Sequence, residues 1–224
     1  MLTYALFFGV PMLLAMWAQF KVKSTFNKFA QVPTRGGMTG AEVARAVLDE
    51  AGLYNVKVEP TNGFLSDHYD PRGKVLRLSE ATYNERSVSA AGVAAHEAGH
   101  ALQDKEKYTP LVWRSAMVPA VQFGSMLGPI AIMAGLAINI TGLAWVGVIL
   151  FAAASVFSLV TLPVEFDASN RAKAMLAKMN LVTTQEGEGV DKVLDAAALT
   201  YVAAAVASVA QLLYYVLMLT GRRD

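Results

Sequence analysis

The chain has 224 residues, of which 54% are hydrophobic and 17% are charged, and its formal net charge at pH 7 is +1. A balance this close to neutral, without a basic cluster, gives no indication of nucleic-acid binding. Because the chain has no cysteine, disulfides and thiolate metal ligands are excluded, and only His, Asp and Glu remain as side chains for a metal site.

Three stretches of the chain contain no Asp, Glu, Lys or Arg: residues 2–20, 115–164 and 196–220. About 20 apolar residues in a helix cross a bilayer, so the first and last stretches fit one crossing each and the middle one fits two. Buried helices of a soluble protein are the alternative, but with a mean hydropathy of +0.38 the small polar remainder could not enclose them. The sequence therefore predicts a mainly α-helical membrane protein with about four transmembrane helices.

The first stretch is interpreted as a retained membrane anchor, because it lacks an A-x-A cleavage site before Lys21. Lys21, Lys23 and Lys28 follow it at once, and residues 21–114 carry thirteen of the nineteen Lys and Arg. Lys and Arg are enriched on the cytoplasmic side of membrane proteins. We therefore expect a multi-pass protein of the plasma (inner) membrane whose first polar segment, residues 21–114, is cytosolic.

The first polar segment has the pattern of a small α+β domain. Residues 39–42, Thr-Gly-Ala-Glu, have the spacing of a capping box, and the helix that they begin is expected to end near Gly52. Residues 55–59 alternate in polarity and predict a short strand. Residues 64–70 and 74–79 flank a Pro-Arg-Gly turn and predict a β-hairpin.

The predicted strand at residues 74–79 leads into the next helix, and its role has two interpretations. Its edge could pair with an extended substrate through main-chain hydrogen bonds. Alternatively, the strand only covers the helix that follows it. The sequence favours neither interpretation.

The helix after this strand carries the sequence HEAGH. Ser87 or Ser89 is a candidate N-cap, and the segment has no proline. Residues i and i+4 share one face of a helix, so His96 and His100 can direct their imidazoles at one metal ion. Glu97 lies beside them, where its carboxylate reaches a water on the metal and could act as general base. H-E-x-x-H is the pattern of zinc hydrolases, and a buried helix with two hydrogen-bonded His is the alternative.

The remaining chain is expected to cross the membrane three more times. Residues 115–164 form a membrane hairpin that turns near residues 139–142, and residues 196–224 form the last transmembrane helix and a short tail. Between them, residues 165–195 return to the side of the HEAGH helix. Residues 183–189, TTQEGEG, are interpreted as a flexible loop within this segment.

A catalytic zinc site needs a third protein ligand besides the two His. Glu165 is the first charged residue after the membrane hairpin, which returns the chain to the side of the HEAGH helix, and His-His-Glu is a known set of catalytic zinc ligands. A solvated acid at the start of a helix is the alternative interpretation of Glu165. Asp104 is a weaker candidate ligand, and Asp167 could orient a ligand His through a hydrogen bond.

Three further residues have roles that the sequence leaves open. His68 or Tyr69, in the predicted hairpin, could donate a hydrogen bond to the oxyanion of a tetrahedral intermediate, or could belong to an ordinary polar turn. Arg171 could bind the substrate or the oxyanion, but its i+4 spacing from Asp167 favours an ion pair within one helix.

Two segments together resemble the YugP-type family of membrane zinc metallopeptidases: GFLSDHYDPRGKVLRLSEATYNERSVSAAGVAAHEAGHALQ and LPVEFDASNRA. The resemblance covers nearly the whole chain, and a more distant one extends to the HtpX and CAAX-prenyl protease group. It implies zinc on His96, His100 and Glu165, with Glu97 as the catalytic base. The distant group has an acidic residue where this chain has Ser169.

We therefore predict a membrane zinc endopeptidase with a small α+β, zincin-like cytosolic headpiece that holds the site at the membrane surface. Zn2+ is the expected cofactor, the bilayer and membrane-associated proteins or peptides are the expected partners, and a homo-oligomer is compatible with the sequence. Two alternatives stay open. One is a zinc hydrolase that cleaves a non-peptide amide or ester, and the other is a membrane interaction protein with a non-catalytic zinc site.

Overall fold

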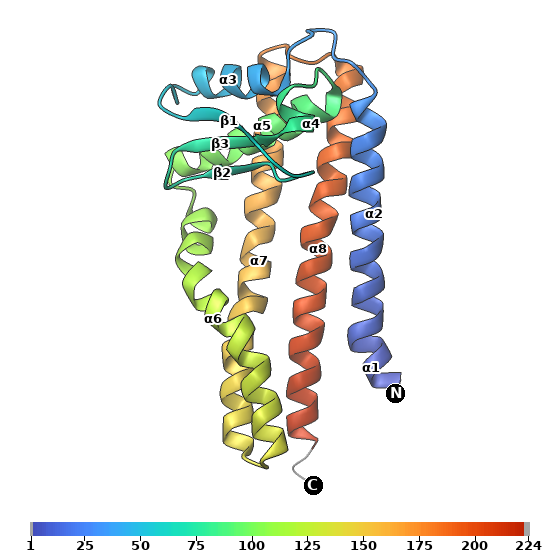
Figure 1. Ribbon diagram of the computed structural model, residues 1–224, viewed down its shortest axis with the longest axis vertical. Helices are drawn as coiled ribbons and strands as arrows, with labels where there is room; N and C mark the ends of the chain where they lie inside the picture. The colour runs from blue at the N-terminus through green and yellow to red at the C-terminus, as the bar shows by residue number, and fades with distance from the viewer. Residues whose placement is uncertain (1, 222–224) are drawn as a thin grey trace. The chain divides into compact units, whose positions relative to one another are not determined.

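The computed structural model describes residues 2–221, and most of these residues lie in helices (Figure 1). The chain divides into two compact units. Within the described residues, the apolar unit comprises residues 2–18, 109–163 and 200–221, and the head unit comprises residues 19–108 and 164–199. The helices and strands are α1 (Leu2–Tyr4), the π-helix η1 (Ala5–Gly9), α2 (Val10–Ala30), α3 (Gly40–Glu50), β1 (Lys57–Thr61), β2 (His68–Asp70), β3 (Val75–Ser79), α4 (Glu80–Tyr83), α5 (Val88–Lys105), α6 (Thr109–Ala137), α7 (Thr141–Lys178) and α8 (Thr184–Thr220).

Within residues 2–221, four helical segments are long and apolar enough to cross a membrane, namely Ala5–Ala30, Thr109–Ala137, Thr141–Lys178 and Thr184–Thr220. The sequence predicted four membrane-crossing helices, and these four segments have the length and composition that the prediction requires. Each segment extends beyond its charge-free stretch, because Lys, Arg, Asp and Glu can continue an α-helix once its apolar part has ended.

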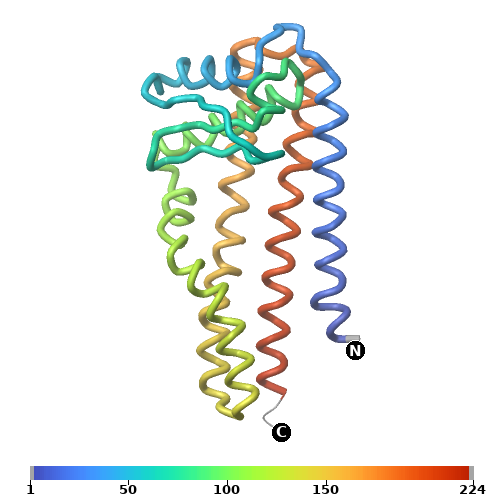
Figure 2. Tube along the Cα trace, in the orientation of Figure 1, coloured from blue at the N-terminus to red at the C-terminus, as the bar shows by residue number. Residues whose placement is uncertain are grey.

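In the apolar unit, α6 packs closely against the first part of α7 (Figure 2). A Cβ atom on Gly124 of α6 would overlap the carbonyl oxygen of Leu150 in α7, so a larger residue would push the helices apart. The hydroxyl of Ser155 in α7 donates to the carbonyl oxygen of Ser208 in α8 at 3.0 Å, and the Ser158 and Ser208 hydroxyls lie 2.7 Å apart. Small and hydroxyl-bearing residues are the usual means by which apolar helices associate in lipid.

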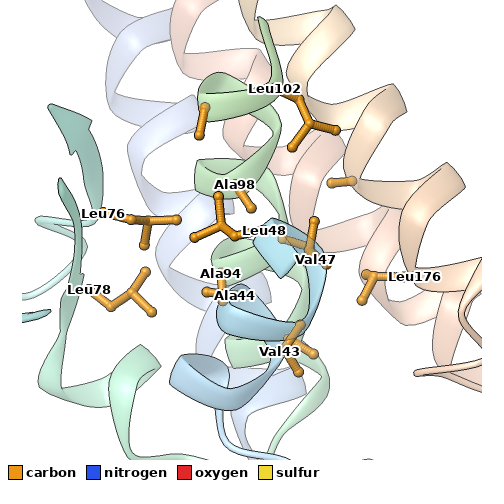
Figure 3. Close-up of a cluster of buried hydrophobic side chains, with 14 of the residues drawn as sticks. Val43, Ala44, Val47, Leu48, Leu76, Leu78, Ala94, Ala98, Leu102 and Leu176 are labelled. Atoms are coloured by element: carbon orange, nitrogen blue, oxygen red, sulfur yellow. The ribbon is translucent and has the colours of Figure 1, made fainter. Parts of the chain in front are cut away.

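The core of the head unit lies between α3, α5 and the sheet (Figure 3). α3 begins with the predicted capping box, which is confirmed: the Thr39 hydroxyl accepts a hydrogen bond from the backbone of Glu42, whose carboxylate accepts one from the backbone of Thr39. The small side chains of α5 let α3 approach it closely, which fixes the helix that carries HEAGH. The labelled core residues are Val43, Ala44, Val47, Leu48, Leu76, Leu78, Ala94, Ala98, Leu102 and Leu176.

The sheet has the strand order β1-β3-β2, so β3 is its central strand. The antiparallel pairing of β2 with β3 confirms the predicted hairpin, with the first strand shortened to His68–Asp70. β1 is parallel to β3 and lies two residues further along the chain than predicted, and Pro60 is tolerated in it because β1 is an edge strand. The interpretation that β3 offers a free edge to a substrate is wrong, because both of its edges pair with neighbouring strands.

The interpretation of residues 183–189 as a loop is also wrong, since α8 begins at Thr184. The Thr183 hydroxyl accepts a hydrogen bond from the backbone of Glu186, and the Glu186 carboxylate accepts one from the backbone of Thr183 at 2.7 Å. This is a second capping box, and it starts the helix in spite of two glycines in its first turns. The same Thr-x-x-Glu spacing that predicted α3 was present here.

Candidate metal centre

The HEAGH sequence lies in the middle of α5, a helix that is buried along most of its length. Ser87 is its N-cap, because the Ser87 side chain accepts a hydrogen bond from the backbone of Ala90, and this confirms one of the two predicted caps. His96 and His100 follow each other by one helical turn, with ring centroids 4.8 Å apart and ring planes at 85°. Both imidazoles therefore reach the same side of α5.

Glu165 projects from α7 to the same place. Its Oε2 atom lies 3.3 Å from Nε2 of His96 and 3.5 Å from Nε2 of His100, and the residue is 2% exposed. Among the described residues, these three form the one group of His, Cys, Asp or Glu arranged to hold a metal ion, with ligand atoms within 4.8 Å of one another. The structure thus brings together the three residues that the sequence singled out.

The distances from the Glu165 oxygen to the two His nitrogens fit zinc. Ligand atoms at about 2.1 Å from a tetrahedral zinc ion are about 3.4 Å apart, which lies between the two nitrogen-to-oxygen distances found here. Two neutral imidazoles and one carboxylate are ligands that zinc accepts, and three protein ligands leave a fourth position for water or substrate. The residues present therefore fit a catalytic type of zinc site.

The other ring nitrogens point away from this centre and have their own partners. Nδ1 of His96 lies 3.1 Å from the hydroxyl of Ser169, which is one turn beyond Glu165 on α7. Nδ1 of His100 lies 3.0 Å from the side-chain oxygen of Gln103, one turn further along α5. Such outer hydrogen bonds hold metal-binding imidazoles in a fixed orientation.

Glu97 is adjacent to His96 in α5 and is 8% exposed. Burial raises the pKa of its carboxyl group, because the charged form loses its hydration. The nearby His100 and His96 oppose this shift, while the charges of Glu165 and Asp67 add to it. A buried carboxylate with a raised pKa is a stronger base than an exposed one.

Asp167 and Arg171 lie behind the centre. Asp167 Oδ2 accepts hydrogen bonds from the amide of Gln103 at 2.8 Å and from Nε of Arg171 at 2.6 Å. The predicted i+4 ion pair of Arg171 is confirmed, and Arg171 also contacts Glu106 at 2.7 Å. Asp167 therefore reaches His100 through Gln103 and does not contact the ring itself.

The other three candidates are engaged elsewhere in the head unit. His68 is exposed on β2, and its Nδ1 atom lies 2.8 Å from the carbonyl oxygen of Ser66. The Tyr69 hydroxyl donates to Asp104 at 2.7 Å, and Asp104 also pairs with Lys74. Burial and the Asp104 carboxylate raise the pKa of Tyr69. Asp104 is not in the His-His-Glu group, so the structure gives it a different role from the one considered for it.

Comparison with known proteins agrees with this geometry. A family model described as "Putative neutral zinc metallopeptidase" matches residues 4–220. The chain belongs to this family of zinc metallopeptidases. It is 51% identical over 211 residues to "Putative membrane protease YugP" of Bacillus subtilis (strain 168), with 94% of each chain covered, which confirms the resemblance noted from the sequence. No solved structure matches the chain.

Two residues beside the candidate ligands were given no role from the sequence, in which Ser169 was noted only as a departure from the distant protease group. Gln103 is three residues beyond His100, and Ser169 is four residues beyond Glu165, so each shares a helix face with a candidate ligand. This spacing was a usable signal. Val164, whose carbonyl oxygen accepts from the Gln103 amide at 2.8 Å, had no such signal because the bond joins different helices.

Proposed function

We propose that the chain is an integral membrane endopeptidase that uses zinc to hydrolyse peptide bonds. The observation that carries this proposal is the position of Oε2 of Glu165, which lies at the spacing of tetrahedral zinc ligands from Nε2 of both His96 and His100. The family assignment of the chain and its four apolar helices support the same function.

His96, His100 and Glu165 would hold the ion, and the HEAGH helix with its small sheet would act as a zincin-like headpiece. When bound, zinc supplies a Lewis acid that lowers the pKa of a coordinated water to about 7. Glu97 accepts a proton from the attacking water and delivers it to the nitrogen of the leaving amine. The buried position of Glu97 next to His96 favours this role, because it raises the basicity of the carboxylate.

The substrates of this site are proposed to be segments of membrane-associated proteins or peptides. The relative in Bacillus subtilis carries the name of a membrane protease, which agrees with this class. Residues 21–114 hold thirteen of the nineteen Lys and Arg of the chain, so we place the head unit on the cytoplasmic side of the plasma membrane.

The test is hydrolysis of an unfolded protein by the full-length chain in detergent, with Glu97→Gln beside the wild type. Glu97→Gln is expected to keep about one zinc per chain and to lose turnover by about 10²- to 10⁴-fold, the usual contribution of a general base. Glu85→Gln is the matched control, because Glu85 is exposed in the segment between α4 and α5.

Undiminished turnover by Glu97→Gln would contradict its role as the general base. The same preparations are assayed on lipid amides and esters. A wild-type enzyme that cleaves these lipids and leaves unfolded protein intact would contradict the proposed peptide substrate and would support the hydrolase of a non-peptide bond.

A further inference from the structure

We propose that Gln103 is a positioning residue that fixes the proton of His100 on Nδ1 and so keeps Nε2 free to bind the metal. This inference rests on the proposed function, since it assigns a role in the zinc site. Gln103 is fully buried, and its side chain lies between the ring of His100 and the acidic and carbonyl groups of α7.

The orientation of the Gln103 amide is set by its neighbours. Its nitrogen lies 2.8 Å from the carbonyl oxygen of Val164 and 2.8 Å from Oδ2 of Asp167. A carbonyl oxygen and a carboxylate paired with Arg171 are both acceptors, so the two amide protons must point at them. The amide oxygen of Gln103 then faces His100, and the reversed orientation would leave both acceptors against another oxygen.

The orientation of this amide determines where the His100 proton lies. The Gln103 oxygen can only accept a hydrogen bond, and it lies 3.0 Å from Nδ1 of His100. Nδ1 must therefore carry the proton. In neutral imidazole only one ring nitrogen is protonated, so Nε2 presents its lone pair toward Glu165, 3.5 Å away.

A lone pair and a carboxylate oxygen at this spacing repel each other unless a cation lies between them. Without Gln103, neutral His100 could move its proton to Nε2 and donate a hydrogen bond to Glu165, which would close the site without metal. By excluding that tautomer, Gln103 keeps neutral His100 in the form whose Nε2 can bind metal. The Ser169 hydroxyl beside His96 can either donate or accept, so it does not impose the same constraint.

The surrounding ion pairs keep Gln103 in this orientation. Arg171 binds both Asp167 of α7 and Glu106 at the end of α5. The Asp167 carboxylate is therefore held as an acceptor for the Gln103 amide, and the two helices are joined behind the ring of His100.

The test measures zinc affinity by chelator competition in the full-length protein in detergent, together with the thermal midpoint of the metal-free form. Gln103→Met preserves much of the side-chain volume but removes the hydrogen bonds. Its zinc dissociation constant is expected to rise about 10- to 100-fold, the usual cost of losing an outer partner of a metal-binding His. Ser169→Ala, which removes a partner without a fixed direction, is expected to cost less.

The double variant Gln103→Glu with Asp167→Asn reverses the hydrogen bond between these two residues, so that residue 167 donates and residue 103 accepts. Its new carboxylate can still accept from Nδ1 of His100, and its new amide can donate in the reverse direction. The Val164 carbonyl oxygen loses its donor in this variant, so we expect zinc binding that is tighter than in Gln103→Met but weaker than in the wild type. It also provides the test if Gln103→Met does not fold.

Wild-type affinity in Gln103→Met, or a folded double variant that binds zinc no more tightly than Gln103→Met, would overturn the inference while leaving the zinc enzyme in place. An equal fall of the metal-free thermal midpoint in both variants, with unchanged zinc affinity, would show a purely structural role and would also overturn it. Absence of zinc binding by the wild type would instead contradict the proposed function on which the inference rests.

Discussion

Gly99 of α5 lies directly against the backbone of Ala168 in α7: a Cβ atom at Gly99 would be 2.6 Å from the Ala168 carbonyl oxygen. Gly99, the glycine of HEAGH, therefore lets α5 cross α7 closely. The two His lie on α5 at this crossing, and Glu165 lies on α7. Because Glu165 reaches Nε2 of both His at this crossing, the local approach of the backbones sets the spacing of the candidate metal centre.

Gly99→Ala is predicted to push α5 and α7 apart. Overpacking of this kind costs about 1–3 kcal/mol of stability, and it should also weaken zinc binding because the distance from His100 to Glu165 increases. The thermal midpoint of the metal-free protein and its zinc affinity check both effects.

Gly187→Ala is the matched control, because nothing lies within 4 Å of a Cβ atom at Gly187 in α8. Alanine is the better helix former, so this change should stabilise the protein by up to about 1 kcal/mol and leave zinc affinity unchanged. Equal effects of the two changes would contradict the steric role of Gly99.

Leu76→Ala is predicted to destabilise the head unit by about 2–5 kcal/mol, because Leu76 is a fully buried residue of β3 in the core beside α5. Denaturant unfolding of the purified protein measures the loss. Tyr54→Ala is the control, since Tyr54 is 76% exposed and its replacement should change stability by less than about 0.5 kcal/mol. Similar losses in both variants would place the core elsewhere.

Asp70 is predicted to make the β2-β3 hairpin sensitive to acid. Hydrogen bonds from the backbone of Gly73 and Arg72 lower the pKa of Asp70, and Arg77 adds to this. A pKa lower in the folded than in the unfolded state contributes stability that is present above the unfolded value of about 3.9 and is lost as pH falls through the folded value.

Amide exchange in the hairpin should therefore accelerate as pH falls below about 4, beyond the intrinsic pH dependence of exchange. Asp70→Asn should remove this acid-induced change in the opening equilibrium. An unchanged acid response in Asp70→Asn would assign the effect to another group.

Local patterns in the sequence were sufficient to predict much of this protein. Thr39 and Glu42 lie three residues apart, and His96 and His100 lie one helical turn apart, so backbone periodicity alone places each pair together. Glu165 was reached by a longer argument, in which the charge-free stretch at residues 115–164 returns the chain to the HEAGH helix. The structure places its carboxylate beside both His.

Contacts between distant parts of the chain were harder to predict. The parallel pairing of β1 with β3, which closes the second edge of β3, joins strands that are not neighbours in sequence. The hydrogen bonds of Gln103 to Val164 and Asp167 likewise depend on how α5 meets α7. Residues 183–189 were misinterpreted for a different reason, because their two glycines outweighed a capping box that was visible in the sequence.

The most direct test of the metal centre is the zinc content of the detergent-purified protein, measured by atomic emission for the wild type, Glu165→Ala and Asp104→Ala. We predict about one zinc per chain in the wild type and in Asp104→Ala, and much less in Glu165→Ala, because Glu165 alone of these two acids lies with His96 and His100. Equal zinc in the wild type and Glu165→Ala, or no zinc in the wild type, would contradict the proposed His-His-Glu centre.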